Sequence, residues 1–120
     1  MDTSKAIPAL TALAHGDRLR VFRHLVAVGP EGRLAGEIAR DLDIRPNTLS
    51  AQLSQLTAAG LVRAAREGRA IRYAADTDGT RALIGFLVDD CCGGRPELCA
   101  PVSGEEVRAR KTDNETFTNA

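Results

Sequence analysis

The 120-residue sequence lacks the features that mark several common classes of protein. No apolar run approaches the roughly 18 residues that a membrane-spanning helix needs, and the N-terminal stretch MDTSKAIPAL has no basic-then-apolar secretion signal. The chain also has no Cys-x-x-Cys motif, no glycine-rich phosphate loop and no Ser, His and Asp set for nucleophilic catalysis. We therefore expect one cytoplasmic domain that is not an enzyme, has no organic cofactor and does not bind a membrane.

Cysteine is scarce, and the positions of the three cysteines are informative. Cys91, Cys92 and Cys99 lie close together near the C-terminus. An odd number of cysteines cannot all pair within one chain, and such clustering is the wrong distribution for a disulfide framework. We therefore expect free thiolates in a reducing compartment.

The sequence also lacks a net charge, because 16 basic side chains balance 16 acidic ones. The charges are unevenly distributed, however. Residues 1–75 carry a net charge of +4 and residues 76–120 a net charge of −4. Residues 44–75 contain five arginines and a single acidic residue, Glu67. A polyanion would therefore meet a strongly basic stretch on a neutral protein.

Apolar spacing predicts a mainly α-helical fold with a small β-hairpin. A first helix has Ile7, Leu10, Leu13 and Ala14 at helical spacing. A second, from about Asp17, is expected to be buried on most sides and to stop at Gly29-Pro30. A third helix carries Leu34, Ile38 and Leu42, and a fourth runs from Pro46 to Gly60. Two helices joined by so short a break form a helix-turn-helix.

The fourth predicted helix has two distinct faces. At 100° per residue, Leu49, Leu53 and Leu56 form the core stripe. The other face has no acidic and no bulky side chain, so it can approach a groove lined with phosphates, and its Asn and Gln side chains can hydrogen-bond to base edges. From this face and the adjoining basic stretch, the candidate DNA-binding residues are Arg45, Asn47, Thr48, Ser50, Gln52 and Gln55.

The segment LVRAAREGRAIRYAA at 61–75 alternates in a way that predicts a hairpin. With a turn at Glu67-Gly68, Arg63 would oppose Arg72 and Arg66 would oppose Arg69. Opposed like charges destabilise an isolated hairpin, and a polyanionic partner would remove that penalty. A helix-turn-helix followed directly by such a hairpin is a winged-helix arrangement.

A last helix is expected to begin at Asp76-Thr77-Asp78. Its apolar stripe is one that a small domain does not cover alone, which predicts a homodimer interface. The interface residues are Leu83, Ile84, Leu87 and Val88. We expect a DNA-binding and dimerisation domain over 1–90, a cysteine-containing effector segment over 91–102 and a disordered tail over 103–120.

Three stretches together resemble the ArsR/SmtB family of metal-responsive winged-helix repressors. They are LAHGDRLRVFRHL (13–25), LAGEIARDLDIRPNTLSAQLSQLTAAGLV (34–62) and REGRAIRY (66–73). The resemblance implies a homodimer that binds a pseudo-palindromic double-stranded operator and leaves it when a metal or metalloid binds. It assigns DNA contacts to Asn47, Thr48, Ser50, Gln52, Arg66, Arg69 and Arg72.

The sequence departs from this family at two of its known metal sites. Where arsenite sensors carry a Cys-x-Cys pair, this chain has Leu34 and Gly36, so that site is absent. The Asp, His and Glu site on the last helix is also absent, because the only histidines are His15 and His24. Gln52 replaces a histidine that is common in the family.

The three cysteines are the remaining candidate effector site. Gly93 and Gly94 permit a reversal that brings Cys99 back toward Cys91 and Cys92, giving a sulfur-only site. Three sulfurs suit As(III) or Sb(III), since zinc normally takes a fourth ligand. Cd(II), Pb(II) or Zn(II), with an added carboxylate oxygen, stays open as an alternative.

Two further readings stay open. A disulfide from Cys99 to Cys91 or Cys92 would make the protein a sensor of thiol oxidation; adjacent cysteines, with Cα atoms ~3.8 Å apart, would form only a strained bridge. From another class, the chain could be a thiol-dependent arsenic-handling enzyme or metallochaperone. Salt-dependent binding to duplex DNA would separate that class from a repressor.

Overall fold

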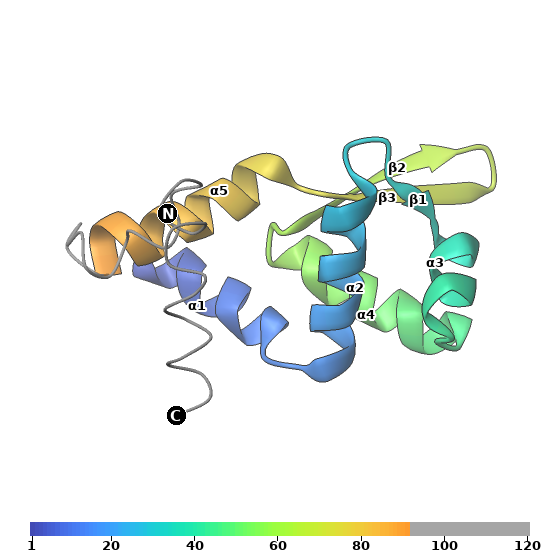
Figure 1. The fold of residues 1–120 in the computed structure, drawn as a ribbon, viewed down its shortest axis with the longest axis horizontal. Helices are drawn as coiled ribbons and strands as arrows, with labels where there is room; N and C mark the ends of the chain where they lie inside the picture. The colour runs from blue at the N-terminus through green and yellow to red at the C-terminus, as the bar shows by residue number, and fades with distance from the viewer. Residues whose placement is uncertain (92–120) are drawn as a thin grey trace, which may run out of the picture. The chain divides into compact units, whose positions relative to one another are not determined.

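The computed structural model describes residues 1–91, with side chains up to Val88. The chain divides into two compact units, Met1–Leu83 and a second that begins at Ile84, and each is considered by itself. In chain order the elements are α1 (Thr3–Leu13), α2 (Gly16–Val28), β1 (Arg33–Leu34), α3 (Ala35–Leu42), α4 (Pro46–Ala58), β2 (Val62–Glu67), β3 (Ala70–Ala75), α5 (Thr77–Gly85) and the π-helix η1 (Phe86–Cys91). Figure 1 shows their course.

The predicted fold class is confirmed: the chain is mainly helical with a β-hairpin wing, β2–β3. The sheet has a third strand that the sequence did not predict, because β1 is only two residues long and so has no alternation to detect. It pairs antiparallel with β3, Arg33 opposite Tyr73, which gives the order β1-β3-β2.

The core lies where α2, α3 and α4 meet the base of the wing. The largest side chains that are fully buried are Val21, Leu25, Ile38, Leu49, Leu53, Leu56 and Leu61. The predicted core stripe of the fourth helix, Leu49, Leu53 and Leu56, is confirmed. In α2, in contrast, Val21 and Leu25 are buried but Leu19 and Val26 are exposed, so the prediction of a helix buried on most sides was wrong.

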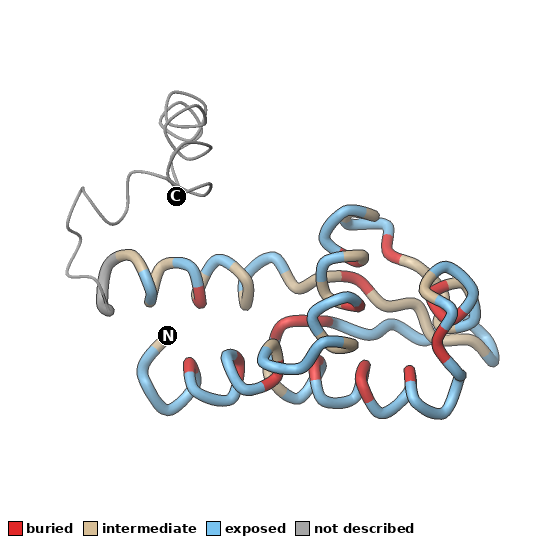
Figure 2. The backbone as a smooth tube through the Cα atoms, turned by 60° about the horizontal axis from the view of Figure 1, so that its bottom comes forward, coloured by how far each residue is buried: buried red, intermediate tan, exposed pale blue. Residues whose placement is uncertain are grey.

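Helix α1 faces the core with alanine. Ala6, Ala9 and Ala12 are buried, whereas Ile7 is 57% exposed and Leu10 is 40% exposed. Figure 2 shows the buried positions recurring along one side of this helix. Small side chains let α1 lie close to its neighbours, so the larger apolar residues, which suggest a core from their spacing alone, point outward.

The helix-turn-helix is formed by α3 and α4. The turn passes through Asp43, which adopts a left-handed conformation with φ 54° and ends α3. Proline at the first position of α4 is suited to a helix start, because its missing N–H has no partner there in any case. Both predicted boundaries of α4 are confirmed to within two residues.

The wing has a different register from the one predicted. Glu67 pairs with Ala70, which places the two-residue turn at Gly68-Arg69, one position later than expected. Arg63 therefore opposes Ala74 and Arg66 opposes Ile71, so the predicted opposition of arginines is wrong. Gly68 has φ 63° and explains the shift: a positive φ at the first central residue is typical of a type II′ turn, which fits hairpins.

Helix α5 begins directly after Asp76, the first of the three residues at which the sequence predicts its start. Asp76 Oδ1 accepts a hydrogen bond of 2.9 Å from the backbone N–H of Gly79. Gly79 also lies against the carbonyl of Gly60, so closely that a Cβ there would collide with it. Within residues 1–91, no helix is long and apolar enough to cross a membrane.

Candidate nucleic-acid interface

The outer face of α4 presents short polar side chains to solvent. Asn47, Thr48 and Ser50 are exposed, and Gln55 is exposed one turn further on. On the opposite side of the helix the three leucines are buried, so this polar side is turned toward solvent. Asn47, Thr48 and Ser50 therefore give α4 a surface that can meet base edges and phosphates. Gln55 lies beside α1, in a hollow that Thr11 and Arg18 also line.

The start of α4 suits an anion. Arg45 is exposed at the N-cap, no side chain caps the helix there, and its first turn contains no acidic residue. The first backbone N–H groups of a helix point outward and carry partial positive charge. A phosphate at this end would meet those N–H groups together with the Arg45 guanidinium.

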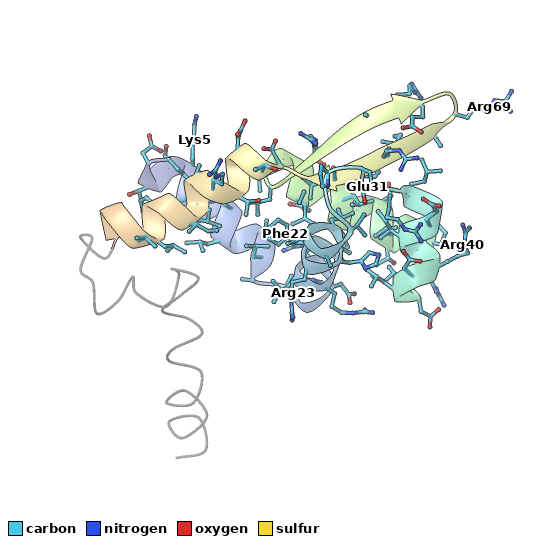
Figure 3. The ribbon with its side chains drawn as sticks, turned by 45° about the horizontal axis from the view of Figure 1, so that its top comes forward. Lys5, Phe22, Arg23, Glu31, Arg40 and Arg69 are labelled. Atoms are coloured by element: carbon cyan, nitrogen blue, oxygen red, sulfur yellow. The ribbon has the colours of Figure 1, made fainter. Side chains whose placement is uncertain are left out.

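The wing adds exposed arginines beside α4. Arg69 lies at the tip of the hairpin and points away from the fold, as Figure 3 shows. A groove of about 290 Å³ between the wing and the helix-turn-helix is lined by Arg69, Ala70 and Ile71 on one side and by Pro46 and Ser50 on the other. The hairpin tip and the start of α4 thus border the same surface.

Not all of the wing arginines are equivalent. Within the described residues, no ion pair engages Arg63, Arg66 or Arg69, whereas Arg72 pairs with Glu67. Arg72 also donates hydrogen bonds of 3.3 and 3.4 Å to the backbone carbonyls of Glu31 and Gly32. Its charge is compensated within the chain, so Arg66 and Arg69 are the better placed of the predicted wing contacts.

Gln52 has a different position from the rest of its group. The sequence placed it among the DNA contacts, but its side chain is only 8% exposed. Its Oε1 lies 3.5 Å from Nη1 of Arg18 on α2. At 100° per residue Gln52 lies next to Leu56 at the edge of the buried stripe, and the contact with α2 covers that edge.

Helix α3, which directly precedes α4 in the helix-turn-helix, makes polar contacts with α2 and β1. The Asp41 carboxylate lies 2.8 Å from His24 Nε2 on α2 and accepts two hydrogen bonds, of 3.0 and 2.8 Å, from Arg33 on β1. These contacts, the bonds from Arg33 above all, hold the pKa of Asp41 below its usual range. Arg20 of α2 also donates to the carbonyl of Leu42, at the end of α3.

The predicted effector site is mostly beyond the described part of the chain. Cys92 and Cys99 lie outside it, as do the boundaries predicted at 102 and 103, and Cys91 is the last residue of η1. In the part that the structure describes, no three His, Cys, Asp or Glu side chains come together as a metal site. The three-thiol site therefore stays a prediction.

The predicted dimer residues differ in exposure. Leu83 is buried in the core of its own unit. In the second unit, Ile84 is 44% exposed, Leu87 is 37% exposed and Val88 is half-buried. The interface residues predicted from the sequence do not include Ile7 and Leu10, although both are exposed on α1.

Comparison with known proteins supports a regulator fold. Residues 13–64 match the model of a helix-turn-helix domain family. The homodimeric winged helix-turn-helix DNA-binding domain of Mb0332 from Mycobacterium bovis, a possible ArsR-family transcriptional regulator, is 32% identical, with 77% of this chain and 85% of that one covered and a TM-score of 0.59.

Two further solved structures share the fold. HlyU from Vibrio cholerae N16961 is 26% identical, with 77% of this chain and 99% of that chain covered, at a TM-score of 0.59. An ArsR-like transcriptional regulator from Rhodococcus sp. RHA1 is 24% identical, with 81% and 89% covered, at a TM-score of 0.66. None of the curated proteins matches the chain.

Proposed function

The chain belongs to the ArsR family of helix-turn-helix transcriptional regulators, and from that premise we propose that it is a homodimeric repressor of the arsenite-responsive kind. It binds operator DNA through α4 and the wing. It leaves the DNA when As(III) or Sb(III) binds the thiolates of Cys91, Cys92 and Cys99. The observation that carries the proposal is the exposed, acid-free face of α4, bordered by Arg69 of the wing, which no ion pair engages within the described residues.

The proposed binding to DNA follows from shape and charge. An α-helix fits the major groove of B-DNA, and an amide side chain such as that of Asn47 can bond to base edges. Arg45 and Arg69 lie at the margins of this face, where phosphates would pass. Phosphate contacts supply most of the affinity, and the side chains of α4 supply the discrimination between sequences.

The proposed homodimer is supported by exposed apolar side chains. Ile7 and Leu10 on α1 and, separately, Ile84 and Leu87 are large apolar side chains left exposed in the single chain. Mb0332 is described as homodimeric. A two-fold dimer would present two copies of α4 to two half-sites, which matches the near-palindromic operators of helix-turn-helix proteins.

The proposed sensing of As(III) or Sb(III) depends on the chemistry of the cysteines. Three thiolates form a soft donor set, and As(III) and Sb(III) are satisfied by three sulfurs. Binding them would tie the end of η1 to the chain that follows and so shift the balance between DNA-bound and free forms. A coupling free energy of about 1–3 kcal/mol is typical of such linked sites.

The decisive experiment is a fluorescence-anisotropy titration with reduced full-length protein. The probe is a duplex selected by the protein from a random-sequence pool, with an unrelated duplex of equal length as a control. As(III), Sb(III), Cd(II), Zn(II) and peroxide are added in parallel to the preformed complex. We expect As(III) and Sb(III) to release the selected duplex, and the Cys92→Ser variant to bind DNA normally but to resist release.

Each other outcome points to a defined alternative. Release by Cd(II) or Zn(II) alone would indicate a sensor of divalent soft metals, and release by peroxide alone would indicate a thiol-oxidation sensor. Arsenite binding without any salt-dependent DNA binding would indicate an arsenic-handling protein instead. Normal release of the Cys92→Ser variant by arsenite would overturn the three-thiol site.

A further inference from the structure

Arg18 lies at the junction of three helices. It belongs to the first turn of α2, and its Nε donates a hydrogen bond of 2.7 Å to the carbonyl of Ala12, in the last turn of α1. The last carbonyls of a helix have no partner within the helix, and they carry partial negative charge. The guanidinium therefore satisfies one of these carbonyls and neutralises the C-terminal end of α1.

The same guanidinium reaches α4. Its Nη1 lies 3.5 Å from Oε1 of Gln52, between residues 34 positions apart in the sequence. Within the described residues, no buried side-chain nitrogen or oxygen is left without a partner. Because Gln52 is only 8% exposed, solvent is a poor substitute for Arg18, so the amide has one preferred orientation.

On the basis of the DNA binding proposed above, we infer that Arg18 and Gln52 are positioning residues that set the rotation of α4 relative to α1. Neither side chain contacts DNA in this role. Gln52 is in the same helix as Asn47, Thr48 and Ser50, so a rotation of α4 that broke its contact with Arg18 would move all three. Arg18 thereby links the helix that carries the exposed Ile7 and Leu10 to the helix that reads the bases.

The geometry distinguishes this role from direct readout of a base by Gln52. A residue that reads DNA must present its amide to the groove, as the exposed Asn47 at the start of α4 can do. The amide oxygen of Gln52 is directed instead at a positive charge inside the chain. A carboxylate at position 52 would strengthen that contact, whereas at an exposed position it would repel phosphate.

The test compares two substitutions that add the same negative charge to the same helix, Gln52→Glu and Asn47→Asp. Both are measured with the full chain on the selected and unrelated duplexes, after circular dichroism has shown native helix content. We expect Asn47→Asp to weaken binding of the selected duplex at least about tenfold, because like charges approach across the interface. We expect Gln52→Glu to change it by less than about threefold.

A second pair of variants measures positioning itself. Gln52→Leu removes the acceptor, and we expect it to lower the preference for the selected over the unrelated duplex about tenfold, while binding to the unrelated duplex, which depends on exposed arginines, changes little. Retention of that preference by Gln52→Glu would show that the contact with Arg18 matters, since a carboxylate also accepts from the guanidinium.

The outcomes separate the two proposals. Equal losses for Gln52→Glu and Asn47→Asp, in a protein whose wild type binds DNA, would overturn the positioning role alone and return Gln52 to the set of base contacts. An unchanged preference in Gln52→Leu would also overturn it. Failure of the wild-type protein to bind either duplex would overturn the proposed function, and the positioning role with it.

Discussion

Arg72 Nε lies 2.6 Å from Glu67 Oε2, and Nη2 of the same guanidinium lies 3.3 Å from Oε1, so one ion pair joins the two strands of the wing. The hydrogen bonds from Arg72 lower the pKa of the Glu67 carboxyl. The pair cancels one positive and one negative charge on the hairpin. The cations left to meet a polyanion are Arg63, Arg66 and Arg69.

The first prediction follows from this difference between the arginines. Replacing both partners, Glu67→Gln with Arg72→Gln, conserves net charge, and we expect it to leave the salt dependence of DNA binding nearly unchanged. Arg69→Gln should reduce the slope of log K against log salt by about one per subunit. Anisotropy titrations at several salt concentrations measure both. A large loss of slope in the charge-neutral double variant would assign a phosphate contact to Arg72.

The second prediction concerns the approach of α5 to the end of α4. Gly79→Ala places a methyl group against the Gly60 carbonyl, so we expect the free energy of unfolding to fall by about 1–3 kcal/mol or more. Gly36→Ala, in α3, is the matched control, because only the flexible end of Arg40 lies near its added methyl group. The control should gain about 0.5–1 kcal/mol. Urea unfolding curves measure both, and equal midpoints would contradict the close approach.

The third prediction is a loss of stability in acid. Because the pKa of Asp41 is lowered in the folded chain, its contribution is complete above the carboxyl's ordinary pKa, near pH 4, and is lost as the pH falls through the lower, folded value. We therefore expect Asp41→Asn to lower the urea midpoint at pH 7, and this deficit to shrink progressively as the pH falls below about 4. Asp43→Asn is the control, since Asn also tolerates the left-handed conformation. An Asp41→Asn deficit that persisted unchanged in acid would show that packing, and not charge, is lost.

The fourth prediction tests the exposed apolar side of α1. Charging it with Ile7→Lys and Leu10→Lys should shift the dimer toward monomer in sedimentation equilibrium, because two lysines would enter an apolar interface. Val26→Lys charges another exposed apolar residue, on α2, and should leave association unchanged. Equal effects of the charges on α1 and on α2 would remove α1 from the proposed interface.

Much of the fold could be predicted because its signals are local. Proline at 46, the glycine at 60 and the leucine period between them define α4 without reference to the rest of the chain. The cap at Asp76 is equally local. These signals also determine which polar side chains of α4 are exposed, with the exception of Gln52.

The errors arose where two arrangements compete and tertiary packing decides. In α1, apolar residues occur on two sides, and only the neighbouring helices show that the alanines face inward. In the wing, turns at 67–68 and 68–69 both contain Gly68, and they differ by one residue of register. Gln52 lies at the boundary of the two faces of α4, where Arg18, from a different helix, determines its burial.

The turn at Gly68-Arg69 has a consequence for mutational scanning. A side chain at position 68 would strain a backbone held at φ 63°, and the hairpin would relieve that strain by changing its turn, which would displace Arg69 from the tip. A scan scored by operator binding would therefore rank Gly68 beside the arginine that follows it, although glycine has no side chain to offer DNA. Such a scan would therefore detect residues that position a DNA contact, such as Gly68, together with residues that make it, such as Arg69.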